Sequence, residues 1–130
     1  RLKLQVHEQK AKQAAQLAEV EKAGREQRER LNRSIQIIAQ GVQEDQLTLT
    51  EASIRIKVML DGLGVDEAVQ TEFVAFYQLA KATDHIPILK EWKALPPKRQ
   101  RELDKDRLAA EDKYKDFVVD AAKRILGREF

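Results

Sequence analysis

The sequence predicts an all-α protein, a compact helical bundle with long N-terminal and C-terminal helices, and three observations support this. Charged residues make up 35% of the 130 residues, above the roughly 25% of an average domain. Aromatic residues reach only 5%, with five glycines and three prolines. Apolar residues in most segments recur every three or four positions, which is the spacing of one helix face. We therefore expect helices with wide solvated faces around one core.

Residues 1–30 are almost uniformly polar and rich in the helix formers Ala, Gln, Glu and Lys. Their apolar positions follow heptad spacing only loosely, and Gly24 costs a helix about 1 kcal/mol relative to alanine. A stable coiled coil needs sustained apolar a and d positions. We therefore expect a helical stalk, frayed near its start, followed by a helical bundle domain at 31–130. Oligomerisation through the N-terminal helix is the alternative.

The first core helix is expected at 31–43, where four apolar residues recur at spacings of four, three and four. These are Leu31, Ile35, Ile38 and Val42. The next segment, 47–60, fits both an alternating strand and a helix. Thr48 and Glu51 match a capping box, in which hydroxyl and carboxylate each satisfy a free backbone N–H at a helix start. Because a lone strand would have no pairing partner, we expect a helix at 49–61.

The segment VDEAVQTEFVAFYQLAKATDH predicts a single helix at 66–85. Asp66 is the expected N-cap, and Glu67 suits the positive start of a helix. The helix should end near His85, because the residue before a proline disfavours helical backbone. A short helix of about two turns is expected next, in ILKEWKAL.

Two consecutive prolines, Pro96 and Pro97, end that short helix. Pro97 also suits the first turn of a last helix at 98–126, because the N–H that proline lacks is not needed there. Gly127 occupies the expected C-cap position. The predicted buried face of this helix has three-four spacing and consists of Leu103, Ala110, Tyr114, Phe117, Ala121 and Ile125.

The segment ATDHIPILKEWKALPP, residues 82–97, holds the only tryptophan, all three prolines and one of the two histidines. Neither histidine has a partner at metal-ligand spacing, so we interpret His85 as a cap on free carbonyls at a helix end. Trp92 is expected to pack at the core or its rim, burying about 150–250 Å². The alternative is a partner groove, since aromatic residues are enriched at interfaces. The candidate partner surface is therefore His85, Ile88 and Trp92.

No catalytic, cofactor-binding or metal-binding residue is predicted, and we expect a protein that is not an enzyme. The chain has no cysteine, which excludes thiolate catalysis and Cys-type zinc sites. The phosphate-loop, G-x-S-x-G and H-E-x-x-H motifs are absent. The basic run KRQRELDKDR at 98–107 has interleaved acidic residues, which is typical of a solvated helix rather than of a phosphate-binding surface.

The charges are polarised along the chain although the net charge is only +2. Residues 1–33 carry nine basic and five acidic groups, 34–75 two and seven, and 76–130 thirteen and ten. A dedicated nucleic-acid binder usually presents one strong basic face, so nucleic acid is not the expected partner. A nucleic-acid-associated helical module is the second hypothesis for the function, and a small-molecule enzyme is the third.

The order of four segments resembles an uncharacterised, mainly gammaproteobacterial family of unknown function. The segments are LNRSIQIIAQ, QLTLTEASIRIKVMLD, FVAFYQLAKATDHIP and EWKALPPKRQRELDKDR, and the resemblance covers about residues 30–127. Members of that family have one N-terminal membrane helix, a polar helical linker and a cytoplasmic helical domain. The resemblance implies no activity. It implies that a membrane helix precedes Arg1 and that residues 1–30 are a juxtamembrane linker, whose basic excess suits the cytoplasmic side.

We therefore expect a non-catalytic, membrane-tethered interaction or scaffold domain at the cytoplasmic face of the bacterial inner membrane. Its partner would be a protein that the sequence does not identify, and no cofactor is expected. The chain itself has no apolar run near the roughly 18–20 residues of a membrane span. Without the preceding helix, this fragment is expected to be soluble.

Overall fold

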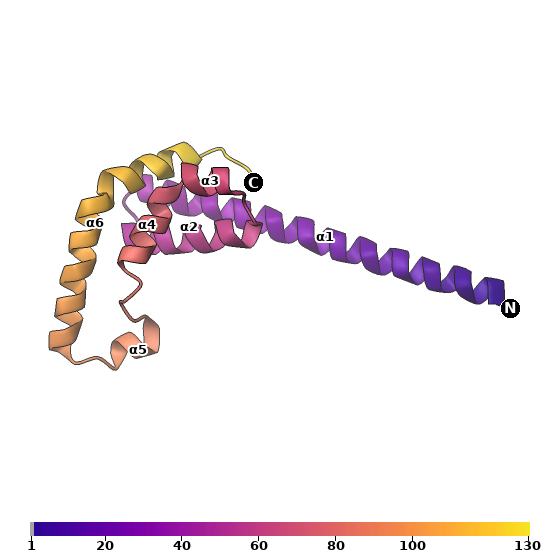
Figure 1. Cartoon of the computed structure of the whole chain (residues 1–130), viewed down its shortest axis with the longest axis horizontal. Coiled ribbons are helices and arrows are strands. Elements are labelled where there is room, and N and C mark those ends of the chain that lie inside the picture. Colours follow the sequence, from indigo (N-terminus) through magenta and orange to yellow (C-terminus); the bar gives the residue numbers. More distant parts are fainter. Residues whose placement is uncertain (1) are drawn as a thin grey trace.

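The computed structural model describes residues 2–130, so Arg1 lies outside the described part of the chain. Its helices are α1 (Leu2–Gln43), α2 (Leu49–Leu63), α3 (Glu67–Glu72), α4 (Val74–Ala82), α5 (Leu89–Lys93) and α6 (Pro97–Ile125). No strand occurs among these residues, and the all-α prediction is confirmed. Figure 1 shows α1 projecting from a bundle, with a hook on the far side made of α5 and the first half of α6. We call residues 84–107 the hook.

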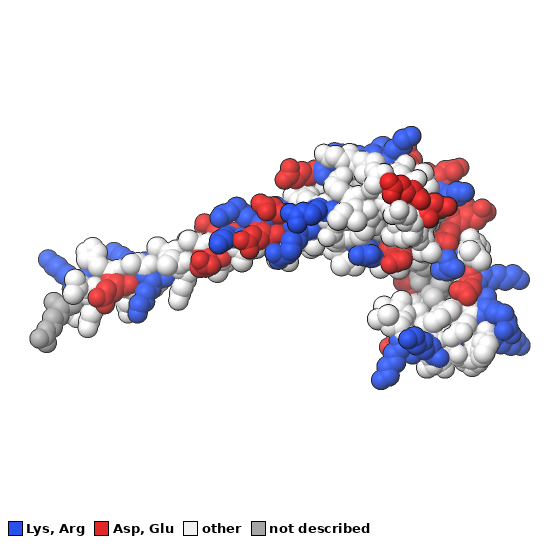
Figure 2. All heavy atoms as spheres, turned by 180° about the vertical axis from the view of Figure 1, so that it is seen from behind, with Lys and Arg blue, Asp and Glu red and all other residues white. Residues whose placement is uncertain are grey.

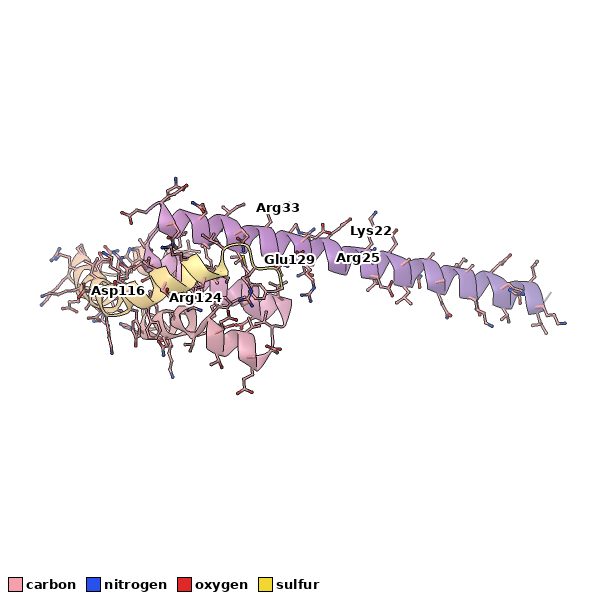
Figure 3. The ribbon with its side chains drawn as sticks, turned by 90° about the horizontal axis from the view of Figure 1, so that it is seen from above. Lys22, Arg25, Arg33, Asp116, Arg124 and Glu129 are labelled. Atoms are coloured by element: carbon pink, nitrogen blue, oxygen red, sulfur yellow. The ribbon has the colours of Figure 1, made fainter. Side chains whose placement is uncertain are left out.

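One continuous helix, α1, both projects into solvent and contributes to the core. Residues 2–30 are all exposed, and Figure 3 shows Lys22 and Arg25 on the part of α1 that projects beyond the bundle. Arg28 reaches the bundle, donating a hydrogen bond to the Leu63 carbonyl at 3.3 Å. From Leu31 onward α1 turns one apolar face inward, as its spacing predicts.

The core lies where α1, α2, α4 and α6 meet. The hydroxyl of Thr48 accepts a hydrogen bond from the Glu51 N–H at 3.1 Å, and Gly64 ends α2 with a left-handed φ of 64°. The helix predicted at 49–61 is therefore confirmed and extends to Leu63. Its buried apolar residues are Ala52, Ile56, Met59, Leu60 and Leu63.

The single helix predicted at 66–85 is wrong in its continuity, because the chain breaks at Phe73. Asp66 caps α3 as predicted, its carboxylate accepting a hydrogen bond from the Val69 N–H at 3.0 Å. Phe73 leaves helical geometry, with φ −110° and ψ 29°. Its ring is fully buried and stacks on Phe76 with 6.4 Å between the centroids. Tertiary packing of one side chain thus interrupts a segment without glycine or proline.

The buried face predicted for α6 is wrong at Phe117. That side chain is 55% exposed, whereas the adjacent Val118 is completely buried. Only the second half of α6 lies on the bundle, while the first half runs away beside α5 (Figure 1). A single apolar face therefore cannot be buried against the bundle along the whole helix. The buried residues of α6 are Leu103, Val118, Ala121, Ala122 and Ile125. Pro97 takes the first helical position, as predicted.

The residues after α6, which we call the tail (126–130), return to α1 and are held by two amide side chains. Asn32 donates from Nδ2 to the Phe130 carbonyl at 2.9 Å, and the Phe130 N–H donates to Asn32 Oδ1 at 2.7 Å. Gln36 Oε1 accepts from the Gly127 N–H at 2.8 Å. The ring of Phe130 meets Phe73 edge to face, with 5.9 Å between the centroids. The tail therefore closes one end of the bundle.

Candidate functional site

A concave, mainly apolar surface lies between α2 and the loop that joins α4 to α5. Two hollows with volumes of about 830 Å³ and 470 Å³ form it. Both are lined by Ile54, Thr83, Ile86 and Ile88, so they are adjoining parts of one surface. We call this surface the groove.

The α2 wall of the groove exists because α2 carries apolar residues on two opposite sides. Ile54 and Val58, one turn apart, are 37% and 60% exposed, whereas Ile56 and Leu60 are completely buried. The alternation at 54, 56, 58 and 60 resembles a strand in the sequence. In the structure it is a helix with a core face and a second apolar face. Sequence analysis singled out neither Ile54 nor Val58, and this double pattern was the available signal.

The opposite wall of the groove consists of the loop leading into α5 and the first residue of that helix, Leu89. Ile88 and Leu89 are 65% and 77% exposed. Leu89 has a φ of 52°, in the left-handed region that is unfavourable for residues with a Cβ. Such backbone strain persists only where the surrounding structure imposes it, and it is concentrated at functional positions. The loop is therefore held in a conformation that leaves two large apolar side chains exposed.

His85 does not cap α4, so this predicted role is wrong. α4 ends at Ala82, and Thr83 caps it: the Thr83 N–H and hydroxyl both donate to the Leu79 carbonyl, at 3.2 Å and 2.9 Å. His85 Nε2 instead lies 3.3 Å from Asp106 Oδ2 on α6, and both side chains are exposed. His85 therefore connects the loop between α4 and α5 to the first half of α6.

Trp92 lies on α5, half-buried and outside the core that the bundle helices form. Its backbone carbonyl accepts a hydrogen bond from Gln100 Nε2 at 2.9 Å, which joins α5 to α6. Of the three residues predicted as a partner surface, the structure brings His85 and Ile88 together in the lining of the larger hollow. Trp92 lines neither hollow.

The polar groups at one edge of the groove are already paired. The Tyr77 hydroxyl donates to Asp61 Oδ1 at 3.0 Å, and Lys57 Nζ lies 3.2 Å from Asp61 Oδ2. Burial, and then the hydrogen bond to Asp61, raise the pKa of Tyr77 well above its ordinary value of 10.0. Tyr77, Asp61 and Lys57 therefore satisfy one another, and most of the groove lining is apolar.

The first turn of α2, which borders the smaller hollow, is anchored to α6. The Thr50 N–H donates to Glu111 Oε2 at 3.1 Å, and Arg107 holds that carboxylate from Nη1 at 2.8 Å. Within the described residues, the buried hydroxyls of Thr50 and Ser53 have no hydrogen-bond partner. The anchoring fixes α2 relative to the hook, and so fixes the width of the groove.

Residues 2–130 contain no group of three or more His, Asp or Glu side chains placed to hold a metal ion. Over the same range, none of the helices combines the length and the apolar character needed to cross a bilayer.

Comparison with known proteins identifies a family but no characterised relative. The family described as "Protein of unknown function (DUF2489)" matches residues 1–125. The match covers almost the whole chain and includes the stalk, which the resemblance over residues 30–127 left out. No curated protein and no solved structure matches the chain. The chain therefore belongs to the DUF2489 family, which confirms the predicted membership of a family of unknown function.

Proposed function

We propose that this member of a family of unknown function is a non-catalytic interaction domain that binds a partner protein in the groove. We propose further that a helix preceding Arg1 tethers it to the cytoplasmic face of a bacterial inner membrane. The observation that carries the proposal is the groove itself, where Val58, Ile88 and Leu89 expose large apolar side chains in a concave surface. Apolar patches rimmed by polar residues commonly mark interaction sites on soluble domains.

The shape of the groove favours a helical partner segment. Its two hollows adjoin along the shared lining of Ile54, Ile86 and Ile88. Two neighbouring apolar side chains from one face of an amphipathic helix, spaced by three or four residues, would each enter one hollow. Burial of apolar area at about 25 cal/mol per Å² would supply most of the binding free energy, since the charges of Lys57 and Asp61 at the edge are already paired.

A site-specific photo-crosslinker tests the partner site in cells that produce the full-length protein. Placed at Val58 or Ile88, it should give one discrete protein adduct. Placed at Ile37, which is 65% exposed on α1 and does not line the groove, it should not. Ile54→Glu should abolish the adduct at Val58, because a bound partner would bury the new carboxylate without a partner charge, which costs desolvation free energy. Equal adducts at Val58 and Ile37, or no adduct at Val58, would contradict the assignment.

The tether is supported by the basic excess of residues 1–33, with nine basic and five acidic groups, and by the resemblance of the sequence to membrane-anchored proteins. Short cytoplasmic segments next to a membrane helix are typically rich in Lys and Arg. The full-length gene product should sediment with membranes and resist washing with concentrated salt. Its recovery in the soluble fraction would contradict the proposed membrane tether. It would not contradict the proposal that a partner binds in the groove.

A further inference from the structure

The acidic and basic residues of the hook, which alternate in the sequence, are separated in space. Three of its carboxylates are paired: Glu102 with Arg99 at 3.1 Å, Asp104 with Arg107 at 3.8 Å, and Asp106 with His85 at 3.3 Å. Among the described residues, five cations of the segment 89–105 form no ion pair. Only one carboxylate of this segment, Glu91, is likewise without an ion pair. These cations are Lys90, Lys93, Lys98, Arg101 and Lys105, and all are exposed. We call segment 89–105 the tip.

Three of the five free cations share one face of α6, and the other two lie on α5. Lys98, Arg101 and Lys105 are spaced by three and four residues, so they lie on one face of α6. At 100° per residue, this face is opposite the buried Leu103. Figure 2 shows Lys and Arg side chains gathered around the free end of the hook. The mixed run KRQRELDKDR therefore presents a basic surface outward, which its composition alone does not predict.

A second basic end lies at the start of α1. This segment contains three lysines, Lys3, Lys10 and Lys12, and one carboxylate, Glu8. All four side chains are exposed. Nearby apolar side chains are also exposed, at Leu2, Leu4 and Val6. In Figures 1 and 2 the start of α1 and the tip lie towards opposite ends of the molecule, and both lie below the level of the bundle. By contrast, residues 34–75 of the bundle carry two basic and seven acidic groups.

We infer that this side of the molecule docks on an anionic lipid surface, which the tip and the start of α1 contact together. A flat anionic surface attracts both basic ends at once and repels the acidic residues of the bundle. The exposed leucines beside the lysines at the start of α1 suit the interface of a bilayer, where apolar side chains enter and lysines meet headgroups. A nucleic-acid backbone would match the cations but would leave these leucines in water. The inference does not rest on the proposed tether, because it concerns the described chain alone.

Trp92, the only tryptophan of the chain, lies within the tip and reports directly on docking. The 130-residue chain is mixed with vesicles of brominated phosphatidylglycerol and phosphatidylcholine, or of brominated phosphatidylcholine alone. At about 0.01 M salt, where the Debye length is about 30 Å, the anionic vesicles should quench Trp92 fluorescence and the neutral vesicles should not. Absence of quenching by the anionic vesicles would overturn the inference.

Matched triple variants test which cations act. One triple variant combines Lys90→Gln, Lys93→Gln and Lys98→Gln. Its affinity for anionic vesicles should fall by roughly tenfold or more, because each cation near the surface contributes up to about a tenfold increase in affinity. The control removes three exposed cations elsewhere, Arg33→Gln, Lys115→Gln and Lys123→Gln, and should bind nearly as the unmodified chain does. Arg33 lies on the bundle part of α1 (Figure 3). Circular dichroism should show the same helical signal for both variants as for the unmodified chain, which checks that they are folded.

Two results would overturn the inference. One is an equal loss of binding in the two triple variants, which would mean that net charge rather than the tip is recognised. The other is retention of duplex DNA or RNA at a salt concentration that releases anionic vesicles, which would assign the basic surface to nucleic acid.

Discussion

Phe117 and Val118 show how adjacent residues of one helix acquire opposite environments. Phe76, by comparison, is fully buried where α4 meets the core. Phe76→Ala should lower the free energy of unfolding by about 3–5 kcal/mol, as large-to-small core changes do. Phe117→Ala should change it by about 0.5 kcal/mol or less, because its side chain is already mostly in water. Denaturant titration of both variants measures these values, and equal losses would contradict the burial of α6 described above.

Ser53 carries a hydroxyl that is completely buried without a hydrogen-bond partner in the described residues. An unsatisfied buried polar group costs about 1–3 kcal/mol, and alanine is the better helix former. Ser53→Ala should therefore raise the free energy of unfolding by about 1 kcal/mol, although most core substitutions lower it. Chemical denaturation measures the change. A loss of stability would show that the hydroxyl has a partner, such as an ordered water.

At the scale of the elements, the exposed part of α1 should be thermodynamically independent of the bundle. Residues 2–24 are all exposed, and deleting residues 1–24 keeps the hydrogen bond of Arg28 to Leu63. The melting temperature should stay nearly unchanged, while far-UV circular dichroism loses helical signal. A marked loss of melting temperature on deletion would contradict this independence, and if that loss depended on protein concentration, it would show that the stalk pairs with a second copy.

Gly24→Ala is the control for that deletion. An added Cβ at Gly24 meets no atom within 4 Å, and alanine favours the helix by about 1 kcal/mol. The variant should gain helical signal with the same melting temperature. The deletion and Gly24→Ala would then change the helical signal in opposite directions while the melting temperature of the bundle stays the same.

Helix ends with local chemical signals could be predicted from the sequence, and those set by tertiary contacts could not. Thr48, Asp66 and Pro97 mark helix starts through their own hydrogen bonds or fixed backbone angles, so they were predicted correctly. The break at Phe73 depends on rings and cations that meet only in the folded chain. His85 was interpreted from its neighbours in sequence, but its partner lies 21 residues away. The groove depends on an exposed apolar face of α2. In the sequence, this second apolar face makes the segment fit both a strand and a helix, so the groove was not predicted.

For the molecule as a whole, an ion pair joins α3 to the tail and makes part of the stability depend on pH. The hydrogen bond from Arg128 lowers the pKa of Glu72 from its ordinary value of 4.5. Since the folded state lowers this pKa, the pair stabilises the fold above the ordinary value, and the contribution is lost as the pH falls through the lowered value. Glu72→Gln should therefore lower the melting temperature at neutral pH and converge with the unmodified chain in acid.

The control for this pH dependence is Glu129→Gln, an exposed carboxylate in the same tail that forms no ion pair among the described residues. Melting curves of the three proteins are compared across the acidic range. A gap between Glu72→Gln and the unmodified chain that persists at the lowest pH would mean that the substitution acts through packing rather than through charge.

The hydrogen bonds between Asn32 and Phe130 join positions 98 residues apart, and this separation bears on how the protein is made. A ribosome adds about 5–20 residues per second, so α1 leaves the exit tunnel several seconds before its partner in the tail exists. During that interval Ile35, Ile38 and the other inward-facing residues of α1 lack most of their final contacts, which come from later parts of the chain. Chains dominated by such distant contacts also fold more slowly than those with local ones. The inward face of α1 is therefore synthesised before the parts of the chain that cover it, and its contacts through Asn32 and Gln36 cannot form until the tail has been made.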